Sequence, residues 1–442
     1  MSNAEFWKMS EKFCYVEFQF SDLLGHLRAM VVPCNPVESL EELAKDPVFK
    51  EGTSVDGSSV TGISSVESSD LRLEADLSTL KELTYTPQRM AAVMCFIRRK
   101  GADPKKTYHA LDSRSVLQSV CERYLKGGMK LMVKMEPEFH AVTDDCEPYD
   151  LGGYADTYPN NPVADTLLEL ATIAQEMGMR VRVAHHEHGN GQLEIELDYD
   201  DARKMADGFL LFKNAARALM QEEGFDVTFM PKPFPGQAGN GLHCHLQLRD
   251  AEKNLFGVDG TDQLSETARM FVAGLLEHSA GITAIANPTV NSYKRLVPHH
   301  EAPVYVCWGP MNRTVLVRVP LFTESKKAAI EIRSPDSMCN PYLLFAAIIA
   351  AGMDGVARKL KPPEPRTEDV FAMTDEQRNT LGIRTLPSTL REAVEALEKD
   401  TVLREALGRE LVDKFVAIKK KECAEYTNFA VTDWEWEMYS SS

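Results

Sequence analysis

Two acidic residues on one predicted strand are the first feature of the sequence that could do chemistry. In the run LMVKMEPEFHAV, Glu136 and Glu138 stand two residues apart, and side chains two apart on a β-strand point to the same face. Two carboxylates on one face repel each other, which raises their pKa values unless a cation lies between them. The spacing therefore indicates a site for a divalent metal ion.

Four other predicted strands carry Glu, His or Arg at alternating or flanking positions. They are HHEHGNGQLEIELDY with Glu187, Glu194 and Glu196, GLHCHLQL with His243 and His245, NRTVLVRVP with Arg313 and Arg318, and AIEIRSPD with Glu331 and Arg333. Each could be a half-buried strand with a solvated face, but solvated faces usually mix Lys, Thr and Ser with the acids. Oxygen ligands with an imidazole suit Mg²⁺ or Mn²⁺ better than zinc. On a strand Cys244 points away from both neighbouring histidines, which disfavours a zinc site at that triplet.

Arginines supply the positive charge that phosphate chemistry needs, because Arg binds phosphate or carboxylate with two parallel hydrogen bonds. Lys326 could add another cation, although it stands beside Lys327 and a surface charge is the simpler interpretation. The sequence has no G-x-x-x-x-G-K-[ST] loop, no G-x-G-x-x-G between a strand and a helix, and neither G-x-S-x-G nor H-E-x-x-H. Metal-assisted chemistry on a carboxylate or a phosphoryl group remains.

Composition and charge exclude several partners and locations. The chain has 442 residues with 49 Lys and Arg against 66 Asp and Glu, a formal net charge of −17, which repels the nucleic-acid backbone. Its nine cysteines contain no C-x-x-C pair and read as reduced residues. The N-terminal residues show no signal pattern, and the longest apolar run, Tyr342 to Met353, is too short to cross a bilayer. We expect a cytoplasmic protein that binds neither nucleic acid nor membrane.

The elements that must position these residues follow from periodicity. Short strands and turns are predicted over the first hundred residues, up to a Lys/Gly/Pro-rich stretch at 98–106. Beyond it, strands alternate with helical patterns at 162–179, 202–223, 265–285, 340–359 and 389–426. We expect an α+β catalytic domain preceded by a small, mainly β domain.

Several runs together resemble the glutamine synthetases of the bacterial and archaeal type. In chain order they are VDGSSV, MEPEFH, HHEHGNGQLEIE, FMPKPF, GNGLHCH, NPTVNSYKRLVPHHEAPV, NRTVLVRVP and IEIRSPDSMCNPYL. The resemblance covers nearly the whole chain. It implies an N-terminal β-grasp domain at 1–104 and a catalytic domain at 105–442, in which helices flank a curved antiparallel sheet. It also implies a homo-oligomer, usually a dodecamer of two stacked hexameric rings, with each active site completed by the adjacent subunit.

The resemblance implies an ATP-dependent ligase that phosphorylates the γ-carboxylate of glutamate and lets ammonia displace the phosphate. Two or three Mg²⁺ or Mn²⁺ ions are implied, one held by Glu138, Glu187 and Glu194 and a second by Glu136, His243 and Glu331. Glutamate would be bound by Gly239, Arg295 and Arg333, and the nucleotide by His245, Arg318 and Lys326. Arg313 would stabilise the transferring phosphoryl group, and Glu301 would close over the intermediate and take a proton. Asp56, with Ser59 and Tyr154, would receive ammonium, Asp56 reaching in from the neighbouring subunit.

Some positions depart from the family pattern. Ala238, Ala329 and Gln247 replace a substrate-side asparagine, a nucleotide-side arginine and a serine, and Phe371 stands near where some members carry a modified tyrosine. The segment His188-Gly-Asn-Gly-Gln resembles relatives of the glutamate–methylamine ligase branch, so a glutamate–small primary amine ligase is an alternative. A catalytically silent homologue and a guanidino kinase are further alternatives. The first is disfavoured because every expected metal ligand is present, and the second because Asp56 and the glutamate-binding pattern would have no role.

Overall fold

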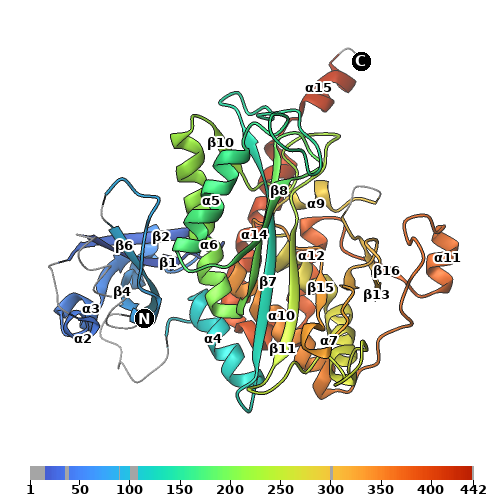
Figure 1. Ribbon diagram of the computed structural model, residues 1–442, viewed down its shortest axis with the longest axis horizontal. Helices are drawn as coiled ribbons and strands as arrows, with labels where there is room; N and C mark the ends of the chain where they lie inside the picture. Colours follow the sequence, from blue (N-terminus) through green and yellow to red (C-terminus); the bar gives the residue numbers. More distant parts are fainter. Residues whose placement is uncertain (1–14, 35–38, 89, 100–107, 299–301, 441–442) are drawn as a thin grey trace.

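The computed structural model describes residues 15–34, 39–88, 90–99, 108–298 and 302–440. The domain boundary predicted at residue 104 lies outside these residues. In Figure 1 an N-terminal domain, drawn in blue, stands beside a larger body built on a second sheet. Within the described residues no helix is both long enough and apolar enough to span a membrane.

The N-terminal domain is a six-stranded sheet with the strand order β2-β1-β6-β4-β3, and β5 pairs with β6. Its strands are β1 (Tyr15–Ser21), β2 (Leu27–Pro33), β3 (Thr53–Asp56), β4 (Asp70–Ala75), β5 (Lys81–Glu82) and β6 (Met90–Arg99). Among the described residues, the helices that accompany them are short, namely α2 (Leu40–Leu43), α3 (Pro47–Glu51) and the single turns η1 (Gly57–Ser59), η2 (Val66–Ser68) and η3 (Leu77–Thr79). Strands β1 and β6 pair in parallel at the centre. The predicted small, mainly β domain is confirmed.

The larger sheet has the order β13-β14-β15-β11-β7-β9-β8, with β10 paired to β7. Its strands are β7 (Lys130–Val142), β8 (Val181–His186), β9 (Gln192–Asp201), β10 (Asp226–Thr228), β11 (Leu242–Arg249), β13 (Trp308–Pro310), β14 (Val317–Val319) and β15 (Ile330–Ile332). All five segments predicted as strands with polar faces contribute to it. The sheet is antiparallel as expected except between β13 and β14, which pair in parallel.

Helices make up much of the rest of this body and confirm the α+β prediction. They are α4 (Ser113–Tyr124), α5 (Ala164–Glu176), α6 (Ala202–Glu222), α7 (Glu266–Glu277), α8 (Ser279–Ala286), α9 (Ser292–Arg295), α10 (Pro341–Ala357), α11 (Asp375–Thr380), α12 (Leu390–Lys399), α13 (Thr401–Leu407), α14 (Arg409–Phe429) and α15 (Asp433–Tyr439); the single turn η4 (Ser325–Lys327) and the pair β12 (Tyr305–Val306) and β16 (Arg384–Thr385) complete the body. The helical pattern at 389–426 is divided into three helices. Asp400 ends α12 and caps α13 with its side chain, and Gly408, with φ of 90°, ends α13.

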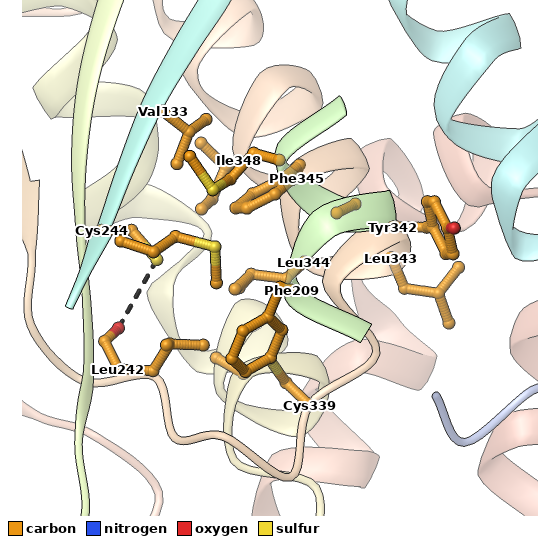
Figure 2. Close-up of a cluster of buried hydrophobic side chains, with 14 of the residues drawn as sticks. Val133, Phe209, Leu242, Cys244, Cys339, Tyr342, Leu343, Leu344, Phe345 and Ile348 are labelled. Carbon is orange, nitrogen blue, oxygen red and sulfur yellow. Dashed lines mark hydrogen bonds between the residues drawn. The ribbon is translucent and has the colours of Figure 1, made fainter. Parts of the chain in front are cut away.

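One face of the large sheet is anchored in an apolar core. Figure 2 shows Val133 of β7 and Cys244 of β11 directed toward Phe209 of α6 and Phe345 of α10. All four side chains are fully buried. Removing apolar surface from water stabilises the fold by roughly 25 cal/mol per Å². This gain determines which face of each strand packs against the helices. The burial of Cys244 confirms that its thiol points away from the neighbouring histidines, which leaves the opposite face for the polar residues.

A buried ion network joins the N-terminal domain to this body. Arg114 of α4 donates to both oxygens of Asp207 on α6, at 3.0 and 2.9 Å, and to Asp76 of the N-terminal domain at 2.9 Å. The hydroxyl of Tyr342 also donates to Asp207 at 2.6 Å. Arg114 is only 2% exposed, so its charge depends on these partners rather than on water.

Replacing Arg114 should therefore destabilise the protein strongly. Arg114→Met leaves Asp207 buried without its cation, and breaking such a pair costs about 3 to 5 kcal/mol. Urea unfolding at a fixed protein concentration measures this loss. As a control, Lys420→Ala removes a surface pair with Glu398 and should cost at most about 1 kcal/mol. Equal losses in the two variants would contradict the role given to the network.

Candidate functional site

A cavity of about 610 Å³ opens on the polar face of the large sheet. It is lined by most of the residues that the sequence predicts for the site, which are Glu136, Glu138, Tyr154, Glu187, Glu194, Gly239, His243, His245, Arg295, Arg313, Arg318, Glu331 and Arg333. The antiparallel register explains the convergence, because His243 pairs with Glu136, Glu138 with Glu194, and His245 with Glu331 across neighbouring strands. Residues predicted from separate segments thus share one cavity.

Two groups of side chains combine carboxylates with an imidazole in the geometry of metal ligands. Glu136, His245 and Glu331 have ligand atoms within 4.8 Å of one another, and so do His185, Glu187 and Glu194. His185 was missed in the sequence, although His185 and Glu187 stand two residues apart and the alternation of a strand would have placed them on one face.

The other two predicted metal ligands lie between these groups. His243 Nδ1 is 3.4 Å from Glu136 Oε2 and 4.0 Å from Glu138 Oε1. Glu138 accepts the backbone N–H of Gly241 at 2.7 Å and the side-chain amide of Gln192 at 3.2 Å. His245, predicted to face the nucleotide, has its Nε2 2.9 Å from Glu136 Oε1, so it belongs to the same group of side chains.

The pKa values in the two halves of the acidic cluster are shifted in opposite directions. Burial raises the pKa of Glu138 and of Glu194 to about 7, and repulsion from neighbouring carboxylates adds to this rise. Burial would also raise the pKa of Glu136, but hydrogen bonds from His243 and His245 lower it far below its usual range. Burial opposes ionisation of Glu331 as well, yet the nearby charges of His245 and Arg333 lower its pKa to about 2.

Arginines surround the acidic cluster. Glu331 accepts from Arg333 at 2.6 Å through one oxygen and from Arg318 at 2.7 Å through the other. Arg295 is buried and donates to the carbonyl of Ser334 at 2.8 Å. A Cβ at position 239 would lie 3.1 Å from the Arg295 side chain, so the predicted glutamate-binding pair stands in contact. These arginines can bind anionic ligands beside the carboxylates.

A buried polar network supports Glu138 from behind. His140 Nδ1 lies 2.8 Å from Asn240 Oδ1, and the amide of Gln192 donates to Asn240 Oδ1 at 3.3 Å and to the carbonyl of Gly239 at 3.1 Å. His140 and Asn240 are fully buried. Sequence reasoning missed this network because it joins residues a hundred positions apart.

Three predicted site residues that the structure describes do not line the cavity. Asp56 and Ser59 lie in the N-terminal domain, where the hydroxyls of Ser58 and Ser59 donate to the Asp56 carboxylate at 2.7 and 2.8 Å. Lys326 is 68% exposed and pairs with Glu324 at 2.7 Å, as expected of a surface charge. Glu301 lies outside the described residues.

The donor set fits hard divalent cations. Both groups consist of carboxylate oxygens with an imidazole, which is the chemistry that Mg²⁺ and Mn²⁺ accept, and neither contains a thiolate. Burial is the main cause of the raised pKa values of Glu138 and Glu194, and repulsion from neighbouring carboxylates adds to it. A cation would relieve this repulsion.

Comparisons with known proteins agree on the family over nearly the whole chain. The family model for the glutamine synthetase catalytic domain matches residues 110–439, and the model for the glutamine synthetase beta-grasp domain matches residues 12–100. The chain is 39% identical to glutamine synthetase from Methanocaldococcus jannaschii over 438 residues, covering 96% of this chain and 94% of the relative. It is 41% identical to glutamine synthetase from Pyrococcus furiosus over 448 residues, covering 98% of each. A solved chain described as a GmaS/ADP complex has a TM-score of 0.87 at 30% identity and covers 100% of this chain and 99% of its own.

Metal binding at this site should strengthen as pH rises. Glu138 and Glu194 carry pKa values raised to about 7, so at pH 6 a cation must displace protons that are absent at pH 8. We expect the affinity for Mn²⁺ to rise about tenfold per displaced proton between these pH values and then to level off. Calorimetric titration of the nucleotide-free protein measures it. An affinity that does not change between pH 6 and pH 8 would contradict the assignment.

Proposed function

This chain belongs to the glutamine synthetase family, and we propose that it is an ATP-dependent ligase that joins glutamate and ammonia into glutamine. The observation that carries the proposal is the single cavity that gathers two acidic groups and four arginines on the polar face of the large sheet. Near-complete alignment with relatives named glutamine synthetase supports the same activity.

The acidic residues divide into two sets of metal ligands. Glu138, Glu187 and Glu194 would hold one divalent ion, and Glu136, His243 and Glu331 a second. Bound Mg²⁺ or Mn²⁺ would neutralise phosphate charge and so favour attack by a carboxylate oxygen on the γ-phosphorus of ATP. His185 is an added candidate ligand, since its Nε2 stands 3.5 Å from Glu194.

The arginines would bind the anionic substrates. Arg295 and Arg333, with the backbone at Gly239, would orient glutamate so that its γ-carboxylate faces the terminal phosphate. Arg313 would stabilise negative charge on the transferring group, since a guanidinium is always charged and presents two donors. Arg318 and His245 would contact the nucleotide. Lys326 would reach the nucleotide only if its exposed side chain moved away from Glu324.

The amine would be handled by residues supplied across a subunit contact. Asp56 and Ser59 lie away from the cavity of their own chain, which fits a homo-oligomer whose neighbouring subunit completes each site. Hydrogen bonds from Ser58 and Ser59 lower the pKa of Asp56, so its carboxylate is ionised and able to attract ammonium and take its proton. Glu301 would shield the intermediate. We further propose a cytoplasmic dodecamer of two stacked rings, with a domain boundary near residue 104.

A glutamate–small primary amine ligase is the second candidate. In addition to the His188-Gly-Asn-Gly-Gln segment, the ring of His188 stacks on Tyr154 with centroids 4.9 Å apart, and both line the cavity. Tyr154 is one of the residues proposed to receive the amine. Its stacked pair with His188 would therefore help to determine how large an amine the site accepts.

A panel of amines separates the two candidates. Initial rates of phosphate release with glutamate, ATP and Mg²⁺ should give the highest kcat/KM for ammonia among ammonia, methylamine and ethylamine. A much larger value for methylamine or ethylamine would assign the second activity. If no amine supports metal-dependent phosphate release, the chain is a silent homologue.

The role of Asp56 can be tested by changing the charge of the nucleophile. Asp56→Asn should lower kcat/KM for ammonia by about 10² to 10⁴, the usual worth of a positioned base, because ammonium must lose a proton before it attacks. Hydroxylamine is already uncharged at neutral pH, so the same variant should keep most of its γ-glutamyl hydroxamate formation. Equal losses with both nucleophiles would contradict the role. Asp70→Asn, a change at the residue that pairs with Asp56 across the sheet, is the matched control.

A further inference from the structure

Lys134 is a cation placed inside the acidic face of the large sheet. It lies on β7 two residues before Glu136, so the two side chains share a face. Its ammonium donates to Glu136 Oε1 at 2.5 Å and to Glu196 Oε2 at 2.8 Å. The side chain is only 9% exposed, so these carboxylates replace most of its hydration. None of the roles given above uses this residue.

Lys134 stands at a third group of acids. Glu136, Glu194 and Glu196 have oxygens within 4.8 Å of one another, which is the spacing of a metal site. Lys134 already bonds two of the three residues. Another cation near this group is Arg182, whose Nε lies 3.7 Å from Glu196 and whose side chain is 52% exposed.

A divalent ion and this ammonium compete for the same oxygens. Like charges a few ångströms apart in a buried site repel strongly, since water screens them poorly. Lys134 and His245 both contact Oε1 of Glu136, whereas Oε2 of the same carboxylate faces His243 at 3.4 Å. The ammonium thus takes one oxygen and leaves the other turned toward the proposed second metal site.

We propose that Lys134 is a built-in cation that fills the group formed by Glu136, Glu194 and Glu196, so that the chain binds two divalent ions rather than three. The inference rests on the proposed function, because it concerns how many of the acids serve metals. In addition, Lys134 acts as a positioning residue that orients Glu136 through a fixed bond to Oε1.

Counting bound Mn²⁺ tests the proposal without measuring activity. Full-length protein without nucleotide is dialysed against saturating Mn²⁺ in enough KCl to screen weak surface sites, and the ions per chain are counted. The wild-type protein should bind two. Lys134→Met should bind three, because the vacated acids accept an ion, and Lys134→Arg should bind two, because the charge is kept. Lys134→Met combined with Glu196→Gln should return to two.

Each outcome decides the matter. Three ions on the wild-type protein, or two on Lys134→Met, would overturn the inference while leaving the ligase assignment intact. No bound ion on the wild-type protein would overturn the proposed metal sites as well. If Lys134→Met fails to fold by circular dichroism, the counts on wild type and on Lys134→Arg still decide between two ions and three.

Discussion

The repulsion between carboxylates buried on one sheet face is the constraint on which the rest of the structure depends. Glu138 and Glu194 pair across β7 and β9, and burial raises the pKa of each. Without a bound cation this arrangement lowers the stability of the fold, because gathering like charges away from water is costly. The arrangement makes sense when cations bind there, and the register that creates it is held by the apolar core on the opposite face of the sheet (Figure 2).

Positively charged and polar side chains around the cavity partly compensate the negative charge of these carboxylates. Arg318 and Arg333 bond both oxygens of Glu331, and Lys134 bonds Glu136. The network of His140, Asn240 and Gln192 holds Glu138 through the amide of Gln192, without an ion pair. The formal charge of −17 therefore overstates how negative the cavity is. Several of these acids already form ion pairs with Lys or Arg, and others are proposed metal ligands.

Much of the site could be predicted because side chains alternate along a strand. Glu136 and Glu138 share a face for that reason alone, and the buried Cys244 confirms the alternation on β11. The pairing of strands could not be read from the same pattern, since it is set by contacts between distant segments. This is why the link from His140 to Asn240 was missed, whereas alternation alone could have placed His185 on one face with Glu187. The division of the helical pattern at 389–426 was also missed, because a capping Asp400 and a positive-φ Gly408 interrupt a continuous apolar period.

The central claim is that these acids and arginines serve phosphoryl transfer to a carboxylate of glutamate. The most direct measurement is the transfer of ¹⁸O from glutamate to phosphate. Glutamate labelled with ¹⁸O in its γ-carboxylate is incubated with ATP, Mg²⁺ and ammonia, and the ¹⁸O content of the released phosphate is determined by mass spectrometry. Since the carboxylate oxygen that attacks phosphorus leaves with it, the account predicts one ¹⁸O atom in each phosphate. Unlabelled phosphate accompanied by glutamine formation would contradict the account.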